Sequence, residues 1–432
     1  MGIETDEPLS PAGRLFVQPA THQIINSVFG LEHAIGLDAL RTVLSDSLLI
    51  KHPRFSSLLV TDDHGLEHWR KTELDIDRHI IIRPDPVGEG DNDEEIVNEY
   101  IADLTVSCPL NTDKPLWEIH LLSAHKCLVL RVHHALGDGI SLASLMLTLC
   151  RKLDDPEQTP TIRPLSSSTN KVHKKLGTWD NFMKVLKMVW FSLVYVCEFM
   201  MRGAWVKDGK TAVSGGEGVE MWPRKLVTAK FSFEDMKTVK SAVANAEGLQ
   251  ITGVALVNLR PSPGLQDMKE LMKKNAGTTG WGNKVGIMLL PVYYHRNRSD
   301  PLQYLKRAKM MMDRKKLSME AVLSHKIGYF VMKYFGAKVA SLLEYKVICN
   351  TSFTISNVVG PREEITVAGI PITYMRTTSS SLPHAITMHM VSYAGKADMQ
   401  ILVAKDLIPD PEKLAKCFED ALQEMKEQAV QM

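Results

Sequence analysis

Residues 131–142 read RVHHALGDGISL, and this stretch decides how the chain is interpreted. An apolar run ends in His133 and His134, Asp138 follows four residues after His134, and Gly139 opens a helical pattern. Because successive side chains of a strand point to opposite faces, the two histidines cannot face the same cleft. A neutral imidazole can accept a proton from a hydroxyl group. The stretch therefore predicts one catalytic and one structural histidine.

The other residues of the stretch are predicted to shape its loop. Gly137 and Gly139 permit a tight turn that a bulkier residue would strain. Asp138 can organise this loop, and a purely structural salt bridge is an equally good interpretation of its carboxylate. Metal binding is disfavoured, because adjacent strand histidines do not share a face and no HExxH helix accompanies them.

The composition excludes several classes of function. The chain has 432 residues, of which 44% are hydrophobic and 23% charged, and its net charge is +1. This length suffices for two domains with well-formed cores. Since the net charge gives no general attraction to polyanions, nucleic-acid binding is disfavoured. Neither a zinc site nor a disulfide framework is indicated, and we expect reduced, mostly buried thiols at the widely spaced Cys108, Cys127, Cys150, Cys197, Cys349 and Cys417.

Helical and strand patterns mix throughout the chain. Residues 116–122 and 127–133 read as strands of a buried sheet, and residues 37–49 as an amphipathic helix. In the second half the patterns predict strands at 251–259, 285–293 and as a pair within 386–403, and helices at 301–317 and 411–427. The Pro-, Ser- and Lys-rich residues 154–175 read as a linker. The sequence thus predicts an α/β (α+β) protein with an N-terminal domain at 1–153, a linker region at 154–225 and a C-terminal domain at 226–432.

The linker region contains a helical stretch at residues 179–201. Its charge-free part covers only residues 188–197, whereas a membrane-spanning helix needs about 20 predominantly apolar residues. Lys184 and Lys187, together with nearby aromatic residues, suit an amphipathic helix at a membrane surface. A helix packed on the protein's own core is an equally good interpretation.

The stretch HHALGDG resembles the HHxxxDG motif of the CoA-dependent acyltransferase superfamily. Further motifs along the chain resemble the plant-type wax ester synthase/diacylglycerol acyltransferase family, in the order expected for that family. These motifs are EPLSPAGRLF at Glu7, PLWEIHLL at Pro115, VNLRPSPG at Val257, WGNKVGIMLLP at Trp281 and SNVVGPRE at Ser356.

The resemblance implies a chloramphenicol-acetyltransferase-like fold of two domains, with the active site at their interface. It also implies a reaction in which a fatty acyl group moves from acyl-CoA, as a substrate, to a long-chain alcohol or to diacylglycerol. No cofactor and no covalent acyl-enzyme are needed. The second histidine of the motif is the base in this family, which assigns that role to His134 and makes His133 and Asp138 organisers of the site.

Other implied assignments concern substrate contacts and location. Trp117, on the strand before the motif, is a candidate substrate contact, although an aromatic side chain there is more often a core residue. Gly139 is a second candidate contact, and Asn357 is a candidate hydrogen-bond donor, although turn chemistry alone also explains the Asn-x-x-Gly-Pro pattern. Family resemblance also implies a membrane surface, cytosol-facing, at the endoplasmic reticulum, with the plasma membrane as a second candidate.

Two alternatives remain open at this point. Residues 281–283 resemble the DFGWG motif of acyltransferases that act on soluble plant alcohols, but the Asp and Phe are missing. In addition, an Asn-Asp segment of roughly thirty residues that the family carries after residue 246 is absent by comparison with its pattern. This absence motivates a catalytically impaired lipid- or partner-binding homologue, and predicts weak activity for this chain.

Overall fold

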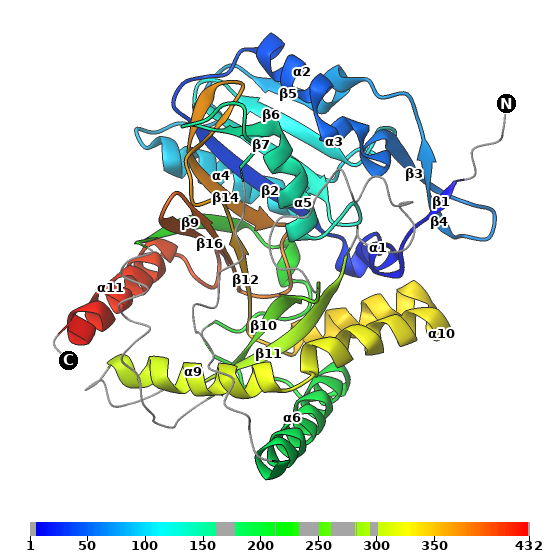
Figure 1. Ribbon diagram of the computed structural model, residues 1–432, viewed down its shortest axis with the longest axis vertical. Helices are drawn as coiled ribbons and strands as arrows, with labels where there is room; N and C mark the ends of the chain where they lie inside the picture. The colour runs from blue at the N-terminus through cyan, green and yellow to red at the C-terminus, as the bar shows by residue number, and fades with distance from the viewer. Residues whose placement is uncertain are drawn as a thin grey trace.

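Two large β-sheets organise the computed structural model, which describes residues 6–160, 178–211, 213–232, 250–260, 281, 283–293 and 301–430 (Figure 1). Within these residues, one sheet has seven strands in the order β5 (Ile80–Arg83), β6 (Trp117–Leu122), β7 (Cys127–His133), β2 (Ile24–Leu31), β14 (Ile370–Ser379), β13 (Ile365–Val367) and β8 (Cys150–Lys152). The second sheet has the order β11 (Val285–Tyr293), β10 (Gln250–Asn258), β12 (Phe353–Val359), β15 (Ile386–Tyr393), β16 (Lys396–Ala404) and β9 (Arg224–Ser232). A small third sheet contains β1 (Glu7–Pro8), β4 (Glu67–Lys71) and β3 (Ser57–Thr61).

Helices cover these sheets and fill the space between them (Figure 1). The N-terminal half contains α1 (Pro11–Phe16), α2 (Leu37–Asp46), α3 (Leu48–Lys51), α4 (Asp93–Ser107) and α5 (Gly139–Met146). The rest of the chain contains α6 (Thr178–Ala204), α9 (Pro301–Leu317), α10 (Glu320–Cys349) and α11 (Pro411–Val430).

Strands β6 and β7 form the centre of the N-terminal core, as the sequence predicts. Every residue of both strands is buried, and the charged side chains among them are paired, since the Arg131 Nη1 donates to the Glu118 Oε1 at 2.6 Å. One apolar cluster contains Val129 of β7, Ile101 of α4 and Leu402 of β16. Because this cluster draws on both large sheets, the two halves of the molecule share part of their core.

The seven-stranded sheet is completed by the C-terminal half of the chain. Strand β14 pairs antiparallel with β2, and β13 pairs antiparallel with β8. The predicted division into domains at 1–153 and 226–432 did not anticipate this crossover. A local pattern identifies a strand, but the partner of that strand depends on which apolar faces meet in three dimensions.

Most of the predicted elements are confirmed with small shifts at their ends, and β11 and α9 have the predicted bounds. The helix expected at 37–49 is divided at Ser47, whose extended backbone ends α2 and whose Oγ accepts a hydrogen bond of 3.4 Å from the Ile50 N–H of α3. Most of the linker predicted at 154–175 lies outside the described residues.

Helix α10 has two arms that meet at Gly336. This residue has a φ of 86°, which glycine adopts without the steric penalty that a side chain would bring. The arms pack near α6, β11 and α1. Figure 1 shows α10 and α6 at the end of the molecule away from the seven-stranded sheet.

Candidate active site

The loop between β7 and α5 carries the HHALGDG stretch. Strand β7 ends at His133, and α5 begins at Gly139 with Asp138 as its N-cap residue. The Oδ1 of Asp138 accepts a hydrogen bond of 3.0 Å from the Ser141 N–H, which satisfies one of the free donors of the first helical turn.

His134 is held by a reciprocal pair of hydrogen bonds to Asn283. The Asn283 Nδ2 donates to the His134 carbonyl oxygen at 2.7 Å, so the amide oxygen of Asn283 faces the imidazole, 3.0 Å from its Nδ1. Because this oxygen can only accept, the proton of a neutral His134 ring lies on Nδ1. The Nε2 atom therefore keeps its lone pair and is available as a base.

The surroundings of His134 keep its ring neutral. The imidazole stacks on Phe16 with 4.1 Å between ring centroids, and the residue is 9% exposed. Burial lowers the pKa of His134 below its usual value, and the hydrogen bond to Asn283 and the charge of Asp138 oppose this shift only in part. At neutral pH the ring is uncharged, which is the form that a general base requires.

His133 points away from the position of His134 and has a structural environment. Its Nδ1 accepts a hydrogen bond of 3.1 Å from the Ala135 N–H, and its ring meets His22 edge-on with centroids 4.7 Å apart. Burial lowers the pKa of His133 to about 3, so this ring is also neutral. The alternation expected from the sequence thus separates the two histidines.

Asp138 connects the motif loop to the other half of the molecule. Both of its carboxylate oxygens contact Arg260, and its Oδ2 also accepts a 3.1 Å hydrogen bond from the Lys284 N–H. The side chains of Asp138 and Arg260 are 3% and 5% exposed. Asp138 is therefore a positioning residue in a buried ion pair, one of the two interpretations that the sequence left open.

The segment around residues 281–284 docks on the same loop. The indole N–H of Trp281 donates to the Leu136 carbonyl oxygen at 2.6 Å, next to the contacts of Asn283 and Lys284. Gly137 leaves room for this docking, because a Cβ there would lie 3.2 Å from the Trp281 ring. Asn283 and Arg260 lie within motifs that the sequence displays, but their roles become visible only when both halves of the chain are in place.

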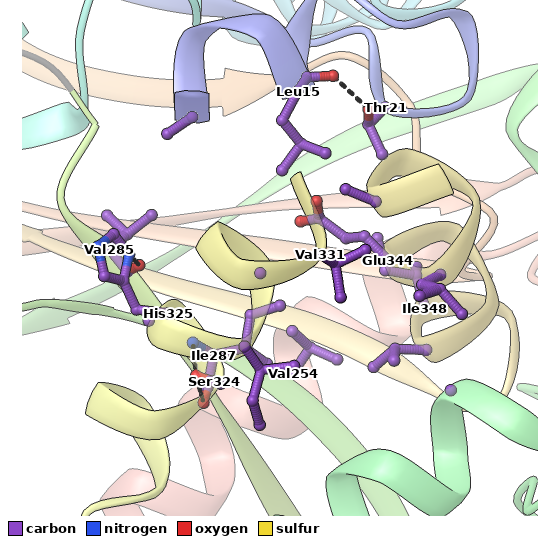
Figure 2. Close-up of a pocket in the computed structure, with 18 of the residues that line it drawn as sticks. Leu15, Thr21, Val254, Val285, Ile287, Ser324, His325, Val331, Glu344 and Ile348 are labelled. Carbon is purple, nitrogen blue, oxygen red and sulfur yellow. Dashed lines mark hydrogen bonds between the residues drawn. The ribbon is translucent and has the colours of Figure 1, made fainter. Parts of the chain in front are cut away.

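His134 lines an apolar cavity of about 580 Å³ between the two halves. Figure 2 shows other residues that line this cavity. The volume lies in the range of small-molecule sites. It is lined by side chains from α1, from the short 3-10 helix η1 (Pro19–Thr21), from β10, β11 and α6, and from both arms of α10. Among these side chains are Leu15, Thr21, Val254, Ile287, Val331, Glu344 and Ile348. The cavity lies between the two halves, where the resemblance implies the active site, and its apolar lining suits the hydrocarbon chain of a lipid.

Trp117 does not line this cavity. Its side chain is fully buried in the N-terminal core, where its indole N–H donates to the Phe55 carbonyl oxygen at 2.9 Å and its ring stacks on His79 at 4.1 Å. The structure therefore places Trp117 as a core residue rather than a substrate contact. Gly139 is likewise absent from the cavity lining and serves as the first residue of α5.

Asn357 lies inside β12 rather than in the expected turn, and its side chain is exposed. Phe353 and Ile355 pack against the core cluster that also contacts α11, whereas Thr354 lines the cavity. Since side chains alternate along a strand, Asn357 projects from the face that points away from the cavity. Its position does not fit the predicted donor role.

No metal site is evident within the described ranges, where no group of three or more His, Cys, Asp or Glu side chains could hold an ion. The six cysteines are free thiols. The expectation that they are mostly buried is wrong, because only Cys127 and Cys150 are buried, while Cys108, Cys197 and Cys417 are exposed.

Family models match both halves of the chain. The model described as the wax ester synthase/diacylglycerol acyltransferase catalytic domain matches residues 32–219, and that of the WS/DGAT C-terminal domain matches residues 281–426. Wax ester synthase/diacylglycerol acyltransferases 6 and 5 of Arabidopsis thaliana are 31% and 32% identical, and each comparison covers 98% of this chain and 94% of the relative. The alignment with the first spans 489 positions, more than the 432 residues of this chain, so that relative carries residues that this chain lacks.

Solved structures show the same fold. The wax ester synthase/diacylglycerol acyltransferase from Marinobacter aquaeolei VT8 aligns with a TM-score of 0.56 at 15% identity, over 98% of this chain and 100% of that one. The first condensation domain of the CDA synthetase aligns with a TM-score of 0.53 at 14% identity, over 99% and 96% of the two chains. These likenesses confirm the predicted two-domain, chloramphenicol-acetyltransferase-like fold.

Proposed function

The chain belongs to the wax ester synthase/diacylglycerol acyltransferase family, and from this premise we propose that it transfers a fatty acyl group from acyl-CoA to a long-chain alcohol or to diacylglycerol. The products are a wax ester and triacylglycerol. One observation carries the proposal: His134 faces an apolar cavity, and Asn283 holds the ring proton on Nδ1 so that Nε2 is free to act as the base.

The geometry supports direct transfer of the acyl group from CoA to the acceptor, without a covalent acyl-enzyme. The acceptor hydroxyl donates a hydrogen bond to the Nε2 of His134 and loses its proton to it as its oxygen forms a bond to the thioester carbon. The carbon–sulfur bond then breaks, and the leaving thiolate of CoA accepts from His134 the proton that came from the acceptor hydroxyl. General base catalysis of this kind contributes about 10²- to 10⁴-fold in rate, and alignment of the two substrates adds to it.

Asn283 and Asp138 support this cycle without touching the reacting atoms. When the His134 ring becomes positively charged, its Nδ1–H bond to the Asn283 oxygen becomes a charge-assisted hydrogen bond. The carboxylate of Asp138 also favours the charged ring electrostatically. The ion pair with Arg260 keeps the loop that carries His134 in place.

The assembled site favours an active enzyme over a silent homologue. His134 is hydrogen-bonded to Asn283. Asp138, on the same loop as His134, is paired with Arg260. The position of the absent Asn-Asp segment, next to residue 246, lies outside the described residues. Weak activity through the loss of that segment stays a prediction.

Purified protein supplied with radiolabelled palmitoyl-CoA and either hexadecanol or diacylglycerol tests the reaction. We expect labelled wax ester or triacylglycerol, with one CoA thiol released per ester formed. Thiol release without ester, or esterification of a short soluble alcohol only, would contradict the proposed acceptor class.

We also propose that α6 attaches the protein to the cytosolic surface of a membrane. The endoplasmic reticulum is the first candidate for this membrane. Trp179, Phe182 and Trp190 of this helix are 70%, 57% and 63% exposed, so this face of α6 is free of the protein's own core, whereas another part of the helix packs against α10. No helix in the part of the chain that the structure describes is both long and apolar enough to span a bilayer. Surface attachment suits α6 because its exposed aromatic side chains can enter the apolar boundary of a bilayer while Lys184 and Lys187 meet anionic headgroups.

Cosedimentation with anionic liposomes tests this attachment. The double variant Lys184→Glu/Lys187→Glu should bind less than the wild type. Unchanged binding by this variant would contradict the role of α6.

A further inference from the structure

A second exposed apolar surface lies on α10, around the junction of its two arms. Large apolar side chains here are between 40% and 62% exposed, namely those of Tyr329, Phe330, Tyr334, Phe335, Val339, Leu342 and Leu343. Such a concentration of exposed aromatic and aliphatic groups is unusual for a surface that meets only water.

This surface lies next to that of α6, because the two helices pack against each other. Together, the exposed apolar side chains of α6 and α10 form what we call the α6–α10 surface. The charges on its α10 part have one sign: Lys326, Lys333 and Lys338 are exposed, and α10 has no acidic residue between Glu320 and Glu344.

The cavity that contains His134 reaches this surface. Met200 of α6 and Tyr329 and Leu343 of α10 line the cavity and are 52%, 52% and 40% exposed. Side chains that contact both the cavity and the outside mark an opening. The opening therefore lies between α6 and α10, inside the exposed apolar surface.

The side chain of Glu344 adds a polar group to this otherwise apolar passage. It follows Leu343 on α10 and lines the cavity, and Figure 2 shows its carboxyl group projecting from the helix toward the side on which Leu15 lies. Its Oε2 is buried and has no hydrogen-bond partner among the described residues. An unpaired polar atom at this depth suits a ligand that is mostly apolar but carries a hydroxyl group.

We propose that the α6–α10 surface rests on a lipid bilayer and that the long-chain acceptor moves from the bilayer through the opening between the two helices directly to His134. The inference rests on the proposed function and adds the route by which a water-insoluble substrate reaches the site. A route through water would expose every methylene group of the chain, whereas this route keeps the chain in apolar surroundings.

A bilayer fits this surface better than a second copy of the chain. Two copies joined through the α10 face would bring Lys326, Lys333 and Lys338 of each near those of the other. Anionic headgroups instead complement these lysines while the aromatic side chains enter the apolar boundary.

The first test uses the double variant Tyr334→Glu/Phe335→Glu, because neither residue lines the cavity. Phe418→Glu on α11, at another exposed aromatic position, is the matched control. Transfer from palmitoyl-CoA is measured with hexadecanol in vesicles of phosphatidylcholine and phosphatidylserine, and with butanol in solution. We expect the double variant to lose vesicle binding and at least ten-fold in the hexadecanol rate while keeping the butanol rate, and the control to keep all three. Unchanged vesicle binding, or equal losses with both alcohols, would overturn the proposal.

A second variant separates attachment from passage. Gly328 lines the cavity, and a Cβ added to it would meet no atom within 4 Å. The variant Gly328→Trp should therefore narrow the passage without a clash at the backbone. This variant should bind vesicles normally, and its hexadecanol rate should fall further than its butanol rate, whereas full hexadecanol transfer would overturn the proposed route. If the wild type transfers the acyl group to neither alcohol, the proposed function fails. In that case the comparison of vesicle binding by the wild type and by the Tyr334→Glu/Phe335→Glu variant still decides whether the α6–α10 surface meets a membrane.

Discussion

Replacing Asn283 with Ala removes both hydrogen bonds that orient His134 and fix its ring proton. During transfer the His134 ring becomes charged, and a hydrogen bond to a charged group contributes about 1.5–3 kcal/mol. Since each 1.36 kcal/mol is a factor of ten in rate, we expect turnover to fall by about 10- to 160-fold. Binding of acyl-CoA should change little, because Asn283 contacts His134 rather than the cavity.

Single-turnover transfer of a palmitoyl group to hexadecanol measures this loss, with Asn111→Ala at an exposed position as the control. The pH profile of the transfer rate distinguishes this role of Asn283 from a purely structural one. In Asn283→Asp the added negative charge raises the pKa of His134, so the acid limb of the profile should move to higher pH relative to the wild type. Normal turnover in Asn283→Ala, or an unmoved acid limb in Asn283→Asp, would refute the assigned role of Asn283.

Three further predictions concern stability and pH. Arg260→Met leaves the buried Asp138 carboxylate without its cation, and urea unfolding should show a loss of about 3–5 kcal/mol; a loss below 1 kcal/mol would contradict the buried ion pair. His133→Ala should lower stability by about 1–3 kcal/mol without a selective loss of turnover, because the ring only supports the loop; a selective loss would mean that His133 is the base. Burial raises the pKa of Glu344 to about 7, so the folded state holds a proton that the unfolded state releases between about pH 4.5 and 7. The free energy of unfolding should therefore fall by about 1–3 kcal/mol as pH rises through this interval, and Glu344→Gln should remove that part of the dependence, as urea unfolding at pH 5 and pH 8 can show.

The elements that build the centre of the fold could be predicted from local patterns. The strands at 117–122 and 127–133 carry enough consecutive apolar residues to be recognised, and the loop that follows them carries its own motif. The separation of His133 from His134 follows from strand alternation alone.

The remaining parts of the site depend on contacts between distant segments. Asn283 lies 149 residues after His134, and Arg260 lies 122 residues after Asp138. No local pattern links such pairs, because the crossover of β14 into the N-terminal sheet and the shared core bring them together. For the same reason the sequence could not show that Trp117 is enclosed in the core or that Asn357 faces away from the cavity.

The exposed apolar surface on α10 could not be predicted from the sequence either. Its apolar residues do not form a regular amphipathic stripe, because Gly336 changes the direction of the helix in the middle of the run. Exposure of this kind becomes visible only when the two arms are placed in space.

The central claim is that the Nε2 of His134 takes the acceptor proton during acyl transfer. Its most direct test compares the single-turnover rates of ester formation by the wild type and by His134→Ala at saturating palmitoyl-CoA and hexadecanol, with His64→Ala at an exposed position as the matched control. Loss of a general base predicts a rate at least about 10²-fold lower for a folded His134→Ala protein, and an unchanged rate for His64→Ala. A folded His134→Ala protein that forms the ester at a rate near that of the wild type would contradict the claim.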